Sequence, residues 1–169
     1  MTGGQIVQNG YVVSDLDAAI AHWIEHTGIG PWTVFRGVTL DGQYRGEDTS
    51  VTFDVAMGYT GSLPVELMAI TSSTPSPYAF DDGTPKLGPH HVAWLRDDLD
   101  ADVAAATARG LQVLFRAGNE ATQVAYLESP DQPGLVFEYI QGHGMREMLD
   151  AGIAAARDWD GTDPVREFG

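Results

Sequence analysis

The sequence of 169 residues contains no cysteine, and its only lysine is Lys86. Without cysteine the chain forms no disulfide, and thiolate ligands and thiolate nucleophiles are excluded. Any bound metal ion would have to be held by histidine, carboxylate or amide groups. The chain is nevertheless long enough to bury a substantial core without cross-links.

Basic residues are scarce, with nine Lys and Arg against 24 Asp and Glu and a formal net charge of −15. This charge repels polyanions, and the few basic side chains form no cluster that would neutralise phosphates. We therefore expect no nucleic-acid partner. The same scarcity argues against a coenzyme A thioester as the substrate.

Long apolar runs are also missing from the sequence. Every run falls short of the roughly 20 residues that a membrane helix requires. The N-terminus lacks the basic and apolar regions of a signal peptide. We expect a soluble, cytoplasmic protein with no membrane partner.

The chain does contain an internal repeat with an offset of 83 residues. The Asp-Leu-Asp-Ala of residues 15–18 recurs at residues 98–101, after a strand-like segment in each case. At the head of these two segments, Gln8 aligns with His91. A repeat that carries polar side chains at equivalent positions is a functional clue, because it brings chemistry from both copies to related places.

Hydrophobic periodicity and turn residues predict the order βαβββ for both copies. The first module covers about residues 5–70 and the second about 87–140, and a Ser- and Pro-rich linker or lid at 71–86 joins them. A C-terminal helix and tail follow at 141–169. These modules predict one domain over residues 1–169, of the α+β class.

Local signals predict where the helices and the first hairpin begin and end. Helices are expected over 15–27 and 98–109, with Ser14 and Asp97 at their N-caps. The Asp41-Gly42 pair predicts a turn between two strands of the first module.

Four polar side chains lie inside otherwise apolar strands: Gln8, Glu66, His91 and Glu138. By strand alternation each shares a face with apolar residues. A buried carboxylate must be paired, protonated or bound to a cation. Taken singly, each glutamate could be an exposed or salt-bridged residue, and the histidine could bond to backbone. Their recurrence at two equivalent positions favours a site for Zn, Ni, Co, Mn or Fe(II).

At these residues the sequence resembles the vicinal-oxygen-chelate superfamily, which includes glyoxalase I, methylmalonyl-CoA epimerase, extradiol dioxygenases and bleomycin-resistance proteins. The segments that carry the resemblance are Val-Val-Ser-Asp-Leu-Asp-Ala-Ala-Ile at 12–20, Pro-Val-Glu-Leu-Met at 64–68, Gly-Pro-His-His-Val-Ala-Trp at 88–94 and Pro-Gly-Leu-Val-Phe-Glu-Tyr-Ile at 133–140. The resemblance implies two βαβββ modules that pair into an open, cupped mixed barrel with outer helices. It implies one metal ligand from each of four strands, at Gln8, Glu66, His91 and Glu138.

The resemblance also implies a function. We expect a metal-dependent isomerase or epimerase, or else a lyase, that transfers a proton alpha to a carbonyl of a small oxygen-chelating substrate. Glu138 is the first candidate base, and Glu66 would serve the opposite face. The alternatives are a metal-free, ligand-sequestering protein and an extradiol-type dioxygenase, although Gln8 stands where such dioxygenases carry histidine.

Two further expectations concern the substrate and a partner chain. Seven aromatic residues are candidates for an apolar substrate pocket, although most aromatic residues on strands are simply core. These residues are Trp32, Phe35, Phe53, Tyr78, Phe80, Trp94 and Tyr126. A homodimer is expected because proteins of this resemblance often pair their modules across chains and because the C-terminal helix carries a second apolar stripe.

Overall fold

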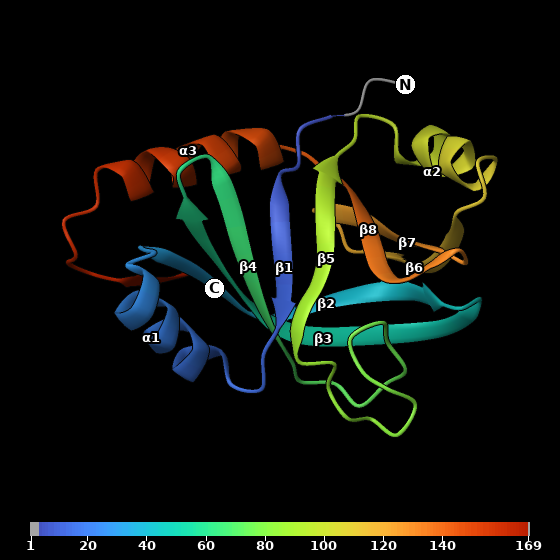
Figure 1. The fold of residues 1–169 in the computed structure, drawn as a ribbon, viewed down its shortest axis with the longest axis horizontal. Helices are drawn as coiled ribbons and strands as arrows, with labels where there is room; N and C mark the ends of the chain where they lie inside the picture. Colours follow the sequence, from blue (N-terminus) through green and yellow to red (C-terminus); the bar gives the residue numbers. More distant parts are fainter. Residues whose placement is uncertain (1–3, 169) are drawn as a thin grey trace.

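The computed structural model describes residues 4–168, and within them it contains the expected pair of βαβββ modules (Figure 1). Residues 1–3 and 169, the two ends of the predicted domain 1–169, lie outside the described residues. The first module consists of β1 (Gln8–Val12), α1 (Leu16–Thr27), β2 (Trp32–Tyr44), β3 (Glu47–Thr60) and β4 (Leu63–Ile70). The second consists of β5 (Gly88–Leu95), α2 (Leu99–Thr107), β6 (Gln112–Gly118), β7 (Thr122–Ser129) and β8 (Gln132–Gly142). The chain continues with α3 (Met145–Arg157) and β9 (Val165–Phe168).

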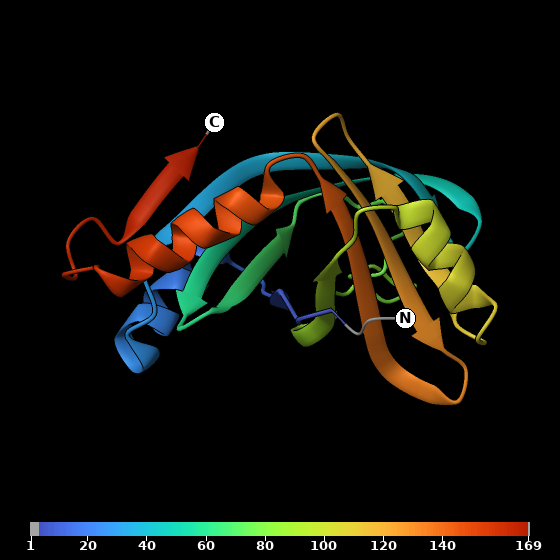
Figure 2. The ribbon, with the colours of Figure 1, turned by 90° about the horizontal axis from the view of Figure 1, so that it is seen from above.

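The eight strands of the two modules form one mixed β-barrel. Their order is β3-β4-β1-β5-β8-β7-β6-β2, and the pairing of β2 with β3 joins the two ends. The modules meet at two antiparallel pairs, β1 with β5 and β2 with β6. The long strand β2 therefore runs across both halves of the molecule (Figure 2). The expected α+β fold of paired modules is confirmed.

The strand register shows that the two modules are related residue by residue. On β1 and β5, Asn9 pairs with Val92, which is its own repeat position 83 residues later. Gly10 pairs with Glu66 on β4, and its repeat position Ala93 pairs with Glu138 on β8. The strand pairs thus place Gln8 equivalent to His91 and Glu66 equivalent to Glu138, as the sequence repeat predicted.

Both helix caps lie one residue later than predicted. The side chain of Asp15, not Ser14, accepts a hydrogen bond from the backbone N–H of Ala18. Asp98, not Asp97, does the same for Ala101. A carboxylate at the N-cap bonds to the N–H three residues on and also favours the positive end of the helix dipole, which favours Asp15 over Ser14. For α2 both candidates are aspartates, and the helix simply begins one residue later than predicted.

The predicted turn at Asp41 and Gly42 is wrong, because both residues lie inside β2. The hairpin turns instead at Arg45 and Gly46, which both have positive φ. Gly42 is needed for a different reason: a Cβ there would collide with the backbone of Arg116 and Ala117 on β6. The glycine therefore permits the close approach of β2 and β6 that joins the modules.

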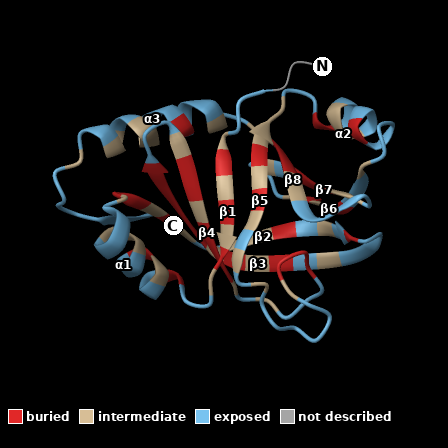
Figure 3. Ribbon diagram, viewed as in Figure 1, coloured by how far each residue is buried: buried red, intermediate tan, exposed pale blue. Residues whose placement is uncertain are grey.

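The helices cover different surfaces of the barrel (Figure 3). Helix α1 packs Leu16 and Ile20 onto the outer face of the first module, and α2 packs Leu99 and Ala106 onto that of the second. Helix α3 instead packs Leu149 against residues of β3. The apolar stripe of α3 is therefore used within the chain, and the homodimer stays a prediction without that support.

Two segments beyond the modules are folded onto the barrel. The linker 71–86 buries Tyr78 completely and is held to β3 by hydrogen bonds from Thr49 Oγ1 to the Pro75 carbonyl and from Thr74 Oγ1 to the Ser50 carbonyl. Strand β9, which the sequence did not predict, pairs in parallel with the first residues of β2. Among the described residues, no helix is long and apolar enough to cross a membrane.

Candidate metal centre

The four polar residues singled out in the sequence come from four consecutive strands of the barrel, β4, β1, β5 and β8. Their side chains converge on His91 Nε2, which lies 2.9 Å from Glu138 Oε2 and 3.2 Å from Glu66 Oε2. Gln8 Nε2 lies 3.4 Å from the same nitrogen and 3.5 Å from Glu138 Oε2. Strand alternation turns all four side chains to the inside of the barrel, and the register of the four strands brings them to the same level.

The electrostatics of the group reflect its burial. The His91 side chain is fully buried, and those of Glu138 and Glu66 are 5% and 14% exposed. Burial acts to lower the pKa of His91, but the two carboxylates more than offset it and raise this pKa to about 10. Burial raises the pKa of Glu66, against the opposing effect of His91. The group therefore binds protons strongly, and these protons would compete with a metal ion.

A second histidine fixes the orientation of the His91 ring. His90 Nε2 lies 3.0 Å from the Pro77 carbonyl oxygen, so this nitrogen must carry a hydrogen and donate it. His90 Nδ1 is then an acceptor for the N–H of His91 Nδ1, 3.1 Å away. Burial, reinforced by the charge of His91, lowers the pKa of His90 to about 3, which keeps this ring neutral. His91 is thus left with Nε2 facing the carboxylates, the arrangement that orients metal-binding histidines in proteins.

Gly10 leaves room for the His91 ring on the neighbouring strand. A Cβ at Gly10 would overlap the imidazole atoms of His91. A glycine inside a strand often marks such a close approach, so this signal was present in the sequence. No such signal in the sequence indicated the role of His90. Strand alternation alone would place the side chains of His90 and His91 on opposite faces of β5, and the partner of His90, Pro77, belongs to the linker.

One oxygen of the group lacks a hydrogen-bond donor. Glu66 Oε2 is buried without a hydrogen bond, although His91 Nε2 is within ion-pair distance, because the single N–H of that nitrogen cannot be directed at both glutamates. A buried carboxylate oxygen in this state is stabilised by a cation. Glu66, His91 and Glu138 each offer one ligand atom, all within 4.8 Å of one another, and could hold a metal ion. The donor set fits a divalent cation of the first transition series.

The group borders a cavity of about 390 Å³. Gln8, Glu66 and Glu138 are polar points in a lining of mostly apolar side chains, and α3 contributes Met145, Met148 and Leu149. Of the seven candidate aromatic residues, Phe35, Phe53, Tyr78 and Tyr126 line this cavity, whereas Trp32, Phe80 and Trp94 do not. No lysine or arginine of residues 4–168 lines it.

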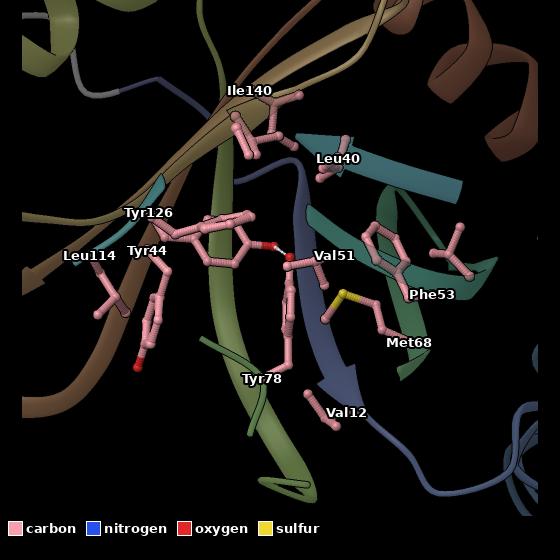
Figure 4. Close-up of a cluster of buried hydrophobic side chains, with 14 of the residues drawn as sticks. Val12, Leu40, Tyr44, Val51, Phe53, Met68, Tyr78, Leu114, Tyr126 and Ile140 are labelled. Atoms are coloured by element: carbon pink, nitrogen blue, oxygen red, sulfur yellow. Dashed lines mark hydrogen bonds between the residues drawn. The ribbon is translucent and has the colours of Figure 1, made fainter. Parts of the chain in front are cut away.

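Two tyrosines of the lining form a buried pair (Figure 4). Tyr78 of the linker donates a hydrogen bond of 2.8 Å from its hydroxyl to that of Tyr126 on β7. The Tyr126 ring lies beside His91, with ring centroids 5.1 Å apart. Burial, with a smaller contribution from the charge of Glu138, raises the pKa of both hydroxyls well above the ordinary value, so both remain protonated.

Comparison with known families and structures places these features in context. Residues 7–126 match the model of the Glyoxalase/Bleomycin resistance protein/Dioxygenase superfamily, a range that includes three of the four converging residues but not Glu138. No protein of curated function matches the chain.

Solved structures with the same fold include a hypothetical protein of Bacillus halodurans, with a TM-score of 0.57 and 16% identity over 83% of this chain and 95% of that one. A methylmalonyl-CoA epimerase variant of Streptomyces coelicolor, in complex with 2-nitronate-propionyl-CoA, has a TM-score of 0.52 and 19% identity, covering 83% and 98% of the two chains. Methylmalonyl-CoA epimerase of Mycobacterium tuberculosis has a TM-score of 0.52 and 17% identity over 88% and 96%. At these identities the likeness is one of fold.

Proposed function

The chain belongs to the Glyoxalase/Bleomycin resistance protein/Dioxygenase superfamily, and on that premise we propose that it is a metal-dependent isomerase or epimerase, or else a lyase, acting alpha to a carbonyl. The observation that carries this proposal is the convergence of Glu66, His91 and Glu138 beside a mostly apolar cavity. Carboxylates on a cavity wall are poor for binding apolar ligands, but they suit proton transfer beside a cation.

The proposed ligands are Gln8, Glu66, His91 and Glu138. The two glutamates would contribute a carboxylate oxygen each and His91 its Nε2. Gln8 would contribute its amide oxygen, which requires its side-chain amide to turn over, because Nε2 faces His91 and Glu138 in this structure. The metal ion, one of Zn, Ni, Co, Mn or Fe(II), would polarise the carbonyl of the substrate and so acidify the neighbouring C–H. Substrate oxygens would take the remaining coordination positions.

The two glutamates are proposed as the groups that move the proton. They occupy equivalent positions in the two modules, on β4 and on β8, and reach the centre from opposite sides of the β1–β5 pair. One carboxylate would take the proton from one face of the substrate, and the other would return a proton to the opposite face, as an epimerisation requires. Burial raises the pKa of Glu66, which makes its carboxylate a stronger base. Glu138 remains the first candidate for the initial abstraction.

The test has two parts, metal content and proton exchange. Protein purified without chelators is expected to contain one divalent metal ion per chain, and His91→Ala is expected to lose it. Metal-loaded protein is then incubated in deuterated water with 2-oxo acids, hydroxyketones, hemithioacetals and acyl thioesters, and NMR measures exchange at the alpha carbon.

Glu138→Gln is expected to lower exchange by at least about a hundredfold, the usual contribution of a general base. Glu128→Gln, on the neighbouring strand β7 but outside the cavity lining, is the matched control and should exchange as the wild type does. Unchanged metal content in both His91→Ala and Glu138→Ala would contradict the metal centre and favour the sequestering alternative. Oxygen consumption with a catechol, without any exchange, would favour the dioxygenase.

A further inference from the structure

The hydroxyl groups of Tyr78 and Tyr126 together carry one hydrogen for which the protein provides no acceptor. Two hydroxyl groups carry two hydrogens, and the bond between them uses one. Among residues 4–168 neither hydroxyl makes another hydrogen bond. One hydroxyl hydrogen is therefore left over, in a place where both side chains are almost fully buried and both line the cavity.

The direction of the bond identifies which hydrogen is left over. Tyr78 donates and Tyr126 accepts, so the hydrogen of Tyr126 is the free one. Tyr126 pairs directly with Glu138 in the β7–β8 ladder and lies beside the His91 ring, so its hydroxyl belongs to the same cavity as the metal centre. Tyr78 has no freedom to turn away, because it is fully buried among Phe53, His90 and Phe115.

A buried donor without an acceptor is costly, whereas a ligand oxygen would satisfy it. We propose that the Tyr126 hydroxyl, held in place by Tyr78, donates a hydrogen bond to a carbonyl oxygen of the molecule that fills the cavity. Most of the cavity lining is apolar and includes Phe53, Met68 and Ile140.

The Tyr126 hydroxyl donor limits the class of substrate that suits the cavity, an inference that rests on the proposed function. A neutral hydroxyl in a cavity without lysine or arginine matches an uncharged oxygen better than a phosphate or a second carboxylate, which need cationic partners. The expected substrate is therefore an uncharged hydroxyketone or dicarbonyl with an apolar substituent. Its oxygens would be shared between the metal and Tyr126.

The experiment uses the full chain without metal and acetophenone as the probe, so that its outcome does not depend on the metal centre. Infrared difference spectra of ¹²C- and ¹³C-carbonyl acetophenone report whether the bound carbonyl accepts a hydrogen bond, because acceptance lowers its stretching frequency. We expect a lowered frequency in the wild type and in Tyr78→Phe. We expect the frequency of an apolar environment in Tyr126→Phe and in the double variant, with probe affinity about tenfold weaker in the double variant.

Tyr139→Phe is the matched control, since Tyr139 follows Glu138 on β8 but packs on the opposite face against Leu99 and Leu127. It should leave the carbonyl frequency unchanged. A lowered frequency that persists in Tyr126→Phe, or the absence of bound probe in wild-type protein, overturns the proposal. If wild-type protein purified without chelators held no metal ion and bound none when it was added, but still lowered the carbonyl frequency, the proposed function alone would be contradicted.

Discussion

At the scale of single residues, the centre depends on small features that hold one imidazole ring. The His91 ring is oriented by the hydrogen bond between its Nδ1 and His90, and it has space because residue 10 is glycine. The four converging residues could be predicted from the sequence, because the repeat and strand alternation fix their positions and their faces. The hydrogen bonds that link Pro77, His90 and His91 could not be predicted, because they depend on how the linker folds onto β5.

Gly10→Ala is expected to abolish metal binding with only moderate loss of stability. The added methyl group would occupy the place of the His91 ring, which is fully buried and must then turn away from Glu66 and Glu138. Overpacking of this kind costs about 1–3 kcal/mol. Elemental analysis and urea unfolding measure the two effects. Retention of one metal ion per chain would show that the ring position is not required.

His90→Ala is expected to weaken metal binding by about 10–100-fold, the usual effect of losing the group that orients a metal-binding histidine. The His91 ring would lose its acceptor at Nδ1 but keep all three facing residues. Competition with a chromogenic chelator measures the affinity. His143→Ala is the control, because His143 lies at the exposed edge of the cavity. Equal affinities for the two variants would mean that His90 has no positioning role.

Metal binding is also expected to release protons. The raised pKa of His91, about 10, means that its ring is protonated at pH 7 in the metal-free protein. A metal ion must displace that proton, so the affinity rises with pH up to about 10, by about tenfold per unit for one proton. Calorimetric titration in buffers of different ionisation enthalpy counts the protons released. An affinity independent of pH between 6 and 9 would be inconsistent with this linkage.

At the scale of elements, the barrel depends on the strands that join the modules. The sequence predicted the strands and helices because their apolar periods differ, two for strands and 3.6 for helices. It misplaced the first hairpin turn because a glycine marks both turns and close backbone approaches, and these two roles look alike in a single sequence. It missed β9 because the residues of this strand are all exposed and show no alternation.

Gly42→Ala is expected to destabilise the protein through the junction between modules. The new Cβ would meet the carbonyl of Arg116 and the Cα of Ala117, which are backbone atoms of a paired strand and cannot move aside cheaply. The expected loss in the free energy of unfolding is about 1–3 kcal/mol or more. Asp41→Ala, at an exposed position of the same strand, should change stability by less than about 0.5 kcal/mol. Equal unfolding midpoints for the two variants would contradict the close approach.

At the scale of the whole molecule, the candidate metal centre lies where the two modules meet. Gln8 and Glu66 belong to the first module, and His91 and Glu138 belong to the second. Without a cation, two buried carboxylates and one histidine share a few protons, and one carboxylate oxygen stays unsatisfied. A bound cation would therefore join the modules as well as serve chemistry.

Metal is accordingly expected to stabilise the entire fold. An ion that binds the folded chain alone stabilises it by about 2.7 kcal/mol at a free concentration of 100 times Kd, so the unfolding temperature should rise with metal concentration. The same metal should leave the unfolding temperature of His91→Ala unchanged, and EDTA should return the wild type to its metal-free value. If the metal bound only at the exposed acidic surface, His91→Ala would be stabilised equally, and the shared centre would be ruled out. Calorimetry of wild type and variant, each with and without metal, distinguishes the two cases, because only binding at the module junction makes the stabilisation depend on His91.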